Sequence, residues 1–242
     1  MKILVDTHTH TIASGHAYST LNEMVLAAKE EGLEMLAVTE HTNRMPGSPH
    51  AFYFHNLRVV PRNMHGIELL MGAELNIIDY NGNVDMSDGE LSQLDICIAS
   101  MHIPCIDPGT IEENTNAMIG AMKNPYVNII GHPDDGRYKV DYEKVVAAAK
   151  ENQVLLELNN NSLNPKGFRM NTKENDIKML ELCKQQQVMI AMGSDAHIAN
   201  DVGNHCYSEE ILRITSFPDE LIVNLVPERL KEFISQKRKS LS

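Results

Sequence analysis

MKILVDTHTHTIASGH, residues 1–16, joins a short apolar run to three histidines. Residues 3–5 suit a strand buried on both faces, because they are uniformly apolar and polar residues follow at once. His8 and His10 are two positions apart, so their side chains share one face of an extended segment. His16 follows after the loop sequence TIASG. Histidines gathered where a strand ends predict a positively charged ligand such as a metal ion.

Six later segments repeat this pattern of an apolar run that ends abruptly in polar or charged residues. They are 35–38, 69–71, 96–99, 127–130, 154–158 and 188–192. Such runs alternating with helical patterns predict a parallel sheet with right-handed crossovers. Closed on itself, the sheet forms a seven-stranded α/β barrel related to the TIM barrel, in one domain covering residues 1–242. The alternative is an open doubly wound sheet, but that fold concentrates polar residues at one switch point.

Helical segments are predicted between several of the strands. A capping box of Thr20 and Glu23 opens the first helix. Asp141 is expected to be the N-cap of a later helix, and the segment that begins at Asn171, residues 171–174, is expected to cap another. Residues 42–68 are less regular and are predicted to form a long loop with a helical piece.

The composition limits the partners of the protein. A net charge of −12 argues against a nucleic-acid or membrane surface as the partner, since both are polyanionic. No apolar stretch approaches the roughly 20 residues that a membrane span needs, and no secretory leader is expected. The four cysteines lack CxxC spacing, so we expect reduced, mostly buried thiols in a cytoplasmic protein.

Nine potential metal ligands are expected at one rim of the barrel, because the carboxyl ends of all its strands meet there. They are His8, His10, His16, His41, Glu74, His102, His132, Asp195 and His197. Imidazole together with carboxylate is the ligand set of zinc, manganese or iron. A catalytic zinc takes about three protein ligands, so nine supply about three ions, with Glu74 able to bridge two of them.

Each of these residues has a simpler explanation when it is taken alone. A single strand-end histidine is more often structural than ligating, and Glu74 or Asp195 alone would more often serve as a helix cap or loop acceptor. Nine separate explanations at matched strand ends are less economical than one metal site. The remaining histidines do not end apolar runs and are predicted to be surface or loop residues: His50, His55, His65 and His205.

Three further residues are candidates for binding substrate. Arg137 and Arg169, on loops after the fifth and sixth runs, are placed to contact a phosphate. For each arginine, a solvated surface position is the simpler interpretation. Asn159, at the end of the sixth run, is a candidate contact to the substrate or to groups that surround the ligands.

Six short motifs resemble the PHP (polymerase and histidinol phosphatase) superfamily in order and spacing along nearly the whole chain. They are DTHTHT, TEH, GAELNI, SMH, GHP and GSDAH. The segments HAYSTLNEM and ELIVNLVPERLKEF resemble the YcdX-like phosphatases in particular. The second motif usually reads Thr/Ser-Asp-His in the superfamily, so Glu40 is a departure, and it is not expected to bind metal.

The resemblance implies a distorted (β/α)7 barrel with a trinuclear zinc site. It divides the nine rim residues among three ions: His8, His10, Glu74 and Asp195 on the first, Glu74, His102 and His132 on the second, and His16, His41 and His197 on the third. This division agrees with the count of about three ligands for each zinc.

Metal-dependent hydrolysis of a small phosphorylated substrate is the predicted function. About three Zn2+ ions, or Mn2+ or Fe2+ in their place, would activate a bridging hydroxide as the nucleophile. The candidate catalytic residues are Asp195 and His197 for proton transfer and Glu74 as the bridging ligand. A covalent phosphoenzyme is disfavoured, because no cysteine is followed six positions later by arginine.

Two other functions stay open. An amidohydrolase-type enzyme also begins with HxH, but it often bridges its metals with a carboxylated lysine, and no lysine ends a middle strand here. A catalytically silent, metal-stabilised binding module is the second. The sequence does not choose among sugar phosphates, histidinol phosphate and nucleotides as substrates, and it leaves a homo-oligomer open.

Overall fold

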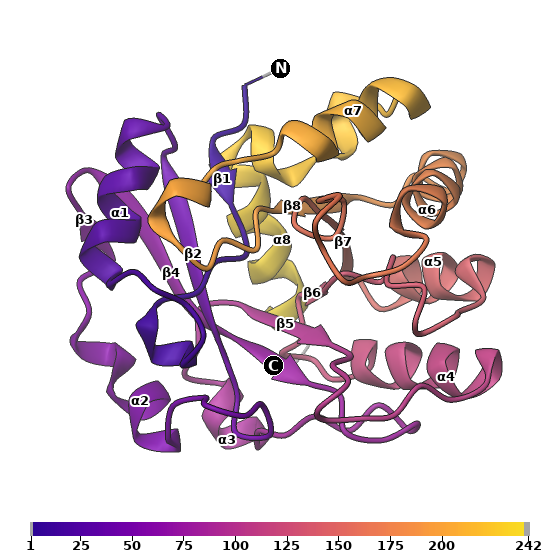
Figure 1. The fold of residues 1–242 in the computed structure, drawn as a ribbon, viewed down its shortest axis with the longest axis horizontal. Coiled ribbons are helices and arrows are strands. Elements are labelled where there is room, and N and C mark those ends of the chain that lie inside the picture. Colours follow the sequence, from indigo (N-terminus) through magenta and orange to yellow (C-terminus); the bar gives the residue numbers. More distant parts are fainter. Residues whose placement is uncertain (1, 240–242) are drawn as a thin grey trace.

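The computed structural model describes residues 2–239, which are arranged around a seven-stranded parallel barrel (Figure 1). The strands are β1 (Val5–Asp6), β2 (Met35–His41), β3 (Asn63–Met64), β4 (Ile67–Asn76), β5 (Cys97–Ser100), β6 (Ile129–Ile130), β7 (Leu155–Asn159) and β8 (Ile190–Gly193). Their order is β1-β2-β4-β5-β6-β7-β8, and the short β3 pairs antiparallel with β4.

The two ends of the sheet meet through residues just beyond β1 and β8. Thr9 and Ala196 form a parallel bridge, and the Asp195 N–H donates to the carbonyl of His8 at 2.9 Å. The strand order never reverses, so the sheet has no switch point. The predicted α/β barrel is therefore confirmed, and the alternative of an open doubly wound sheet is wrong.

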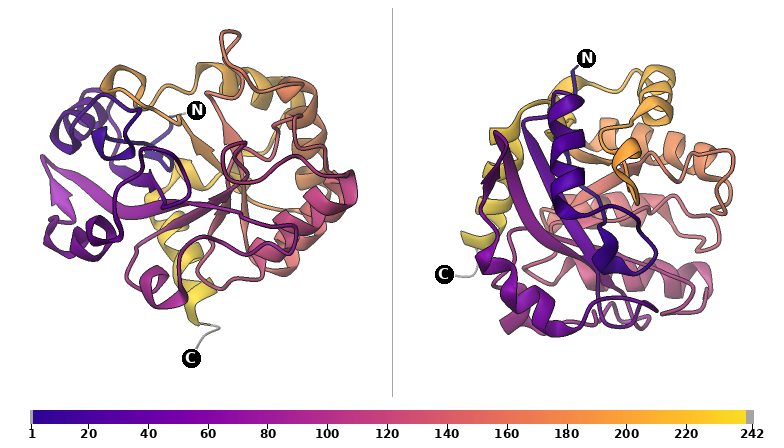
Figure 2. Two further views of the ribbon diagram at one scale, coloured as in Figure 1. Left: turned by 60° about the horizontal axis from the view of Figure 1, so that its bottom comes forward. Right: turned by 60° about the vertical axis from the view of Figure 1, so that its left-hand side comes forward.

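Helices surround the strands on several sides (Figures 1 and 2). They are α1 (Leu21–Glu30), α2 (Ala51–Asn56), α3 (Asp88–Leu91), α4 (Ile111–Met122), α5 (Tyr142–Glu151), α6 (Thr172–Gln186), α7 (Cys206–Thr215) and α8 (Pro227–Lys239). Helices α4 to α7 form an arc on one side of the molecule, and α1 and α2 lie on the other. No helix in the described part of the chain has the length and apolar character needed to cross a membrane.

The strands are apolar on both faces, as expected for a buried parallel sheet. The larger apolar cluster lies between the strands and the surrounding helices. A second cluster joins the strand residues Val5, Leu70 and Leu155 to Leu230 and Ile234 of α8. Helix α8 lies behind the strands in Figure 1 and closes this apolar floor of the barrel.

The helix caps test the local predictions. The capping box of Thr20 and Glu23 is confirmed, since the Thr20 N–H donates to the Glu23 carboxylate at 2.6 Å and the Glu23 N–H donates back at 3.4 Å. Asp141 caps α5 with its side chain, as predicted. Asn171 occupies the N-cap position of α6, as predicted, but its backbone is left-handed, with φ 55°, and its side chain makes no capping bond.

The segment 42–68 contains α2 and a 3-10 turn at Leu57–Val59, so its predicted helical piece is confirmed. The short strand β3 in this segment was not expected. Strands β2 and β4 also extend beyond the predicted runs and pair over seven residues, ending with His41 opposite Glu74. These two side chains therefore lie within the strands rather than after them.

The cysteines only partly match the prediction. All four are free, as expected, but only Cys97 and Cys183 are buried, and Cys206 is exposed at the start of α7, against the prediction of mostly buried thiols.

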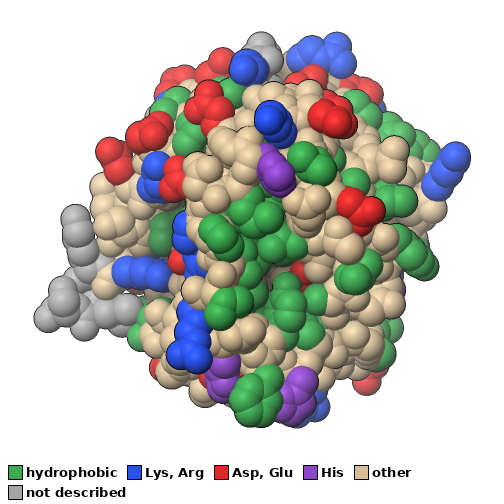
Figure 3. Space-filling model, turned by 90° about the vertical axis from the view of Figure 1, so that its left-hand side faces the viewer, with side chains coloured by type: hydrophobic (Ala, Val, Ile, Leu, Met, Phe, Trp, Pro, Cys, Tyr) green, Lys and Arg blue, Asp and Glu red, His purple; other side chains and the backbone are tan. Residues whose placement is uncertain are grey.

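Exposed apolar side chains gather on the face formed by α1 and α2 (Figure 3), where Leu26 and Phe52 lie.

Candidate metal centre

Glu74 is the centre of the predicted ligand set. The side chain is 1% exposed, and the nearest nitrogens of five imidazoles lie 2.7–3.4 Å from its two oxygens. These imidazoles belong to His8, His10, His41, His102 and His132. Residues that follow three different strands, β1, β5 and β6, and one residue within β2 therefore converge on one carboxylate of β4.

Asp195 lies on the other side of His8 and His10. Its Oδ1 atom is 3.7 Å from His8 Nε2 and 3.5 Å from His10 Nε2. Both Asp195 and His132 have positive φ angles, 55° and 31°, which non-glycine residues rarely adopt. Backbone strain of this kind persists where surrounding structure holds it, often at functional sites.

Three histidines are oriented by a hydrogen bond from Nδ1 to an acceptor behind them. His8 donates to Glu157 at 2.7 Å, His102 to the Asn76 side chain at 2.8 Å, and His197 to its neighbouring backbone carbonyl at 2.9 Å. This arrangement leaves the Nε2 lone pair of each neutral ring free to bind a metal ion. The acceptors therefore select the tautomer that a metal ligand requires.

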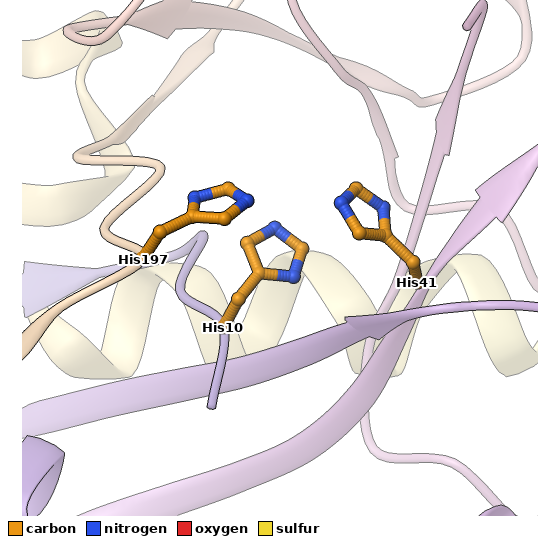
Figure 4. A group of neighbouring side chains, drawn as sticks. All are labelled: His10, His41 and His197. Atoms are coloured by element: carbon orange, nitrogen blue, oxygen red, sulfur yellow. The ribbon is translucent and has the colours of Figure 1, made fainter. Parts of the chain in front are cut away.

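Three groups of ligand atoms are compact enough to hold an ion, each with its atoms within 4.8 Å of one another. They are His8, His10 and Glu74; His41, Glu74 and His102; and His10, His41 and His197. Figure 4 shows the last group, whose rings approach one another from three separate segments. The His16 ring lies beside it, with its centroid 4.9 Å from those of His41 and His197.

The donor set fits a metal ion by its chemistry as well as its spacing. His41 Nδ1 and Glu74 Oε2 are buried and 2.7 Å apart, yet neither makes a hydrogen bond of acceptable geometry. His8 Nε2 and His10 Nε2 face each other at 3.0 Å, where two neutral nitrogens would repel unless a cation or proton lay between them. Buried groups without partners are costly, and a bound cation satisfies them.

Electrostatics shift the pKa values of several of these groups, and they move the two carboxylates and His10 toward the forms that bind metal. Burial lowers the pKa of His8, but neighbouring carboxylates, led by Glu157, outweigh it and hold that pKa well above the ordinary value. Burial and neighbouring imidazoles hold the pKa of His10 well below it. Burial raises the pKa of Glu74 and of Asp195, yet the histidines around them hold both pKa values well below normal. Charged carboxylates and a neutral His10 are the forms that bind metal.

Glu157 on β7 is a residue that the sequence analysis missed. The side chain is fully buried; Oε1 accepts from His8 and Oε2 from the His132 N–H at 2.7 Å. A side chain Cβ at Gly193 would collide with this carboxylate, so glycine keeps the space open. The available signal was a lone acid within the apolar run VLLELN, since a buried charge requires a partner.

Glu40 lies outside the cluster, where its carboxylate is occupied by other partners. It accepts from the Thr11 N–H at 3.1 Å, from the Ser14 hydroxyl and, at 3.3 Å, from Tyr53. Ser14 Oγ lies 3.2 Å from His10 Nδ1 and accepts the backbone N–H of His41. Glu40 thus supports two predicted ligands through Ser14.

Arg169 is not a solvated surface residue, so that interpretation is wrong. Its side chain is 9% exposed, and one guanidinium nitrogen donates to Asp195, Asn159 and Ser162 at 3.0–3.2 Å. The Arg169 side chain is buried because the loop after β7, to which it belongs, folds back over Asp195. Asn159 is fully buried behind Asp195, and its amide also contacts Glu157.

Arg137 occupies a more open position. Its Nε lies 3.0 Å from each oxygen of Asp135, and its side chain is 24% exposed. A cavity of about 420 Å³ opens beside the cluster, and both arginines line it together with His16, His41, His102, Asp195 and His197. Asn159 is not among the residues that line this cavity.

The remaining histidines lie apart from the cluster. His50, His55 and His65 are exposed, as predicted. His205 lies in the loop before α7, as the prediction of a surface or loop residue allows, but it is only 3% exposed, and burial lowers its pKa.

Comparison with known proteins identifies the family of the chain. The family model for the PHP domain matches residues 6–164. A probable phosphatase of Clostridium novyi is 46% identical over 239 residues, which cover 99% of this chain and 97% of that protein. A probable phosphatase of Acetivibrio thermocellus is 46% identical over 242 residues, covering 100% of this chain and 99% of that protein.

A solved structure has a similar fold. Histidinol phosphate phosphatase of Lactococcus lactis, complexed with zinc, L-histidinol and phosphate, gives a TM-score of 0.62 at 17% identity, covering 90% of this chain and 95% of that chain. At this identity the likeness concerns the fold alone. The family match and the full-length relatives together establish that the chain belongs to the PHP domain family.

Proposed function

We propose that this protein is a metal-dependent phosphatase that hydrolyses a small phosphorylated substrate at a centre of about three zinc-type ions. The observation that carries the proposal is the set of five imidazoles around the Glu74 carboxylate. A single bound ion uses about three protein ligands, so a carboxylate with five imidazole neighbours suits a bridge between ions.

The proposed ligand sets are those that the family resemblance implies, and each shares two or three donors with one of the compact groups of ligand atoms. His8, His10, Glu74 and Asp195 would hold one ion, Glu74, His102 and His132 a second, and His16, His41 and His197 a third. Zn2+ is the expected metal, and Mn2+ or Fe2+ suits the same donors. When bound, such ions bind phosphate oxygens, lower the pKa of coordinated water and stabilise charge that develops during phosphoester hydrolysis.

The protein groups have separate roles in the proposal. Glu74 is the bridging ligand, and Asp195 and His197 border the cavity, where they can exchange a proton with water or with the leaving alcohol. Arg169 fixes Asp195 and presents positive charge to the cavity, and Arg137 offers a second guanidinium to an anion. Asn159 is a positioning residue, because its amide is fully used by neighbouring protein groups.

Removal of the central carboxylate tests the proposal. In Glu74→Gln we expect bound zinc, measured by elemental analysis, to fall from about three ions per chain to fewer than two, because the bridge is lost. We expect kcat/KM for phosphomonoesters to fall by about 10³-fold or more. Glu34→Gln, an exposed site at the opposite end of the neighbouring strand, is the control and should change neither quantity.

Chelation separates this function from its rivals. Phosphatase activity that disappears with chelator and returns with zinc supports the proposal. Full activity without metal would contradict it. Hydrolysis of cyclic amides without hydrolysis of phosphoesters would favour an amidohydrolase, and zinc binding without either activity would favour a silent module.

A further inference from the structure

Phe168 is an aromatic side chain that is not buried in the apolar core. It belongs to the loop between β7 and α6, lines the cavity beside the metal centre, and is 69% exposed. A large apolar side chain gains stability by burial, so folding does not account for its open position. An exposed apolar residue in the wall of a functional cavity is typical of a ligand contact.

Two guanidinium groups hold the Phe168 ring. The Arg137 Cζ atom lies 4.8 Å from the ring centroid, and the Arg169 Cζ atom lies 5.7 Å from it. Both distances are within the range of cation–π attraction. Asp135 and Asp195 in turn bind these arginines, so ion pairs hold both guanidinium groups that contact the ring.

The cavity has a chemically mixed lining. Predicted metal ligands line it together with the apolar side chains of Phe168, Ile103, Pro104 and Met45. Its volume of about 420 Å³ lies within the roughly 300–1,000 Å³ of small-molecule sites. A phosphate beside the histidines therefore leaves room for an apolar group on the rest of the same molecule.

The charges in the lining restrict that group further. Among the described residues that line the cavity, Asp195 is the one carboxylate, and Arg169 already binds it. An ammonium group on the substrate would find no unpaired acid there, and it would lie near two guanidinium groups. The lining therefore favours a neutral or anionic group over a cationic one.

We propose that Phe168 is a specificity-determining residue that stacks on a planar, uncharged or anionic group in the alcohol part of the substrate. The inference rests on the proposed function, because phosphate bound at the metal centre places the alcohol part in the cavity. Offset or edge contacts between aromatic rings add affinity beyond the area they bury. Simple amino-alcohol phosphates are then poor ligands.

Three phosphonates that cannot be hydrolysed test the inference by calorimetric binding to the zinc-loaded protein. They are 2-phenylethylphosphonate, propylphosphonate and 2-aminoethylphosphonate. We expect the phenyl compound to bind about tenfold more tightly than the propyl compound. The aminoethyl compound is expected to bind no more tightly than the propyl compound.

Variants test whether Phe168 causes the preference for the phenyl compound. Phe168→Ala should reduce the phenyl-over-propyl preference to less than about threefold, whereas Phe168→Trp should keep it. Phe52→Ala is the matched control, because Phe52 is 75% exposed on α2 and does not line the cavity. This control should keep the full preference. An unchanged Tm for Phe168→Ala excludes a folding effect.

The outcomes distinguish the two proposals. Equal binding of the phenyl and propyl compounds, or a preference that survives in Phe168→Ala, overturns the role of Phe168 and leaves the phosphatase proposal standing. The expected preference without hydrolysis of any phosphoester supports the role of Phe168 and overturns the phosphatase proposal. Failure of all three phosphonates to bind overturns both.

Discussion

The floor and the rim of the barrel are built from the same strand faces, yet their chemistry is opposite. On β4, Leu70 belongs to the apolar floor that α8 covers, and Glu74 lies at the rim on the same face. On β7, Leu155 belongs to the floor, and Glu157 follows two residues later. Alternate residues of a strand share a face. On one face of β4 and of β7, the side chains therefore change from apolar to charged within two to four residues.

The two ends of the barrel therefore serve different purposes, one in stability and the other in binding. Apolar burial at the floor stabilises the fold, because it removes hydrocarbon surface from water. Buried charges at the rim cost several kcal/mol each by desolvation and are tolerated only when they are paired. The rim residues are therefore explained by what they bind rather than by stability.

The largest effect is expected at the floor, where Leu230 of α8 is fully buried. Leu230→Ala should lower the free energy of unfolding by about 2–5 kcal/mol, measured by chemical denaturation, because it leaves a cavity. Bound zinc and kcat of the folded protein should stay unchanged. Glu232→Ala, exposed on the same helix, is the control and should change the unfolding free energy by less than about 0.5 kcal/mol. Loss of bound zinc in folded Leu230→Ala would show that packing at the floor affects zinc binding at the rim.

A smaller effect is expected just below the rim. Glu157→Gln keeps the shape of the side chain but removes the charge that orients His8. We expect zinc affinity to fall about 10–100-fold, measured by competition with a chelator. Glu174→Gln, exposed on α6, should leave the affinity unchanged. If Glu157→Gln binds zinc as tightly as the unchanged protein, Glu157 supports the barrel rather than the ligand.

The smallest effect is expected at the outer edge of the rim. Glu40→Asp shortens the side chain by one methylene, so its carboxylate cannot keep all its contacts to Thr11, Ser14 and Tyr53. Losing one such hydrogen bond should reduce kcat/KM about 2–10-fold. Ser14→Ala removes the hydroxyl between Glu40 and His10 and should have a similar effect. A loss greater than a hundredfold in Glu40→Asp would place Glu40 among the ligands.

Much of the fold was predictable because its signals are local. Each of the seven parallel strands appears as an apolar run that ends in polar residues, and the capping box of Thr20 and Glu23 marks a helix start within four positions. The HxH spacing needs only the two-residue period of an extended chain. The nine candidate ligands could be named because parallel strands bring their carboxyl ends to one rim.

Other features depend on contacts between segments far apart in the sequence, and a local pattern does not specify such contacts. Arg169 was interpreted as a surface residue, and its burial depends on the loop after β7 folding over Asp195. His205 was expected in a surface or loop position; it lies in the loop before α7, but its side chain is buried. Glu157 was missed because its partner, His8, lies 149 positions away.

Local patterns in the sequence are enough to locate the seven parallel strands and most helices and to name the side chains at the strand ends, because periodicity and capping act over a few residues. Which of those side chains meet depends on the tertiary structure. The register of β2 on β4 sets His41 opposite Glu74, and the bridge from Thr9 to Ala196 brings Asp195 to His8 and His10. Strand pairing and barrel closure are long-range choices, made when the apolar faces of the whole chain are buried together.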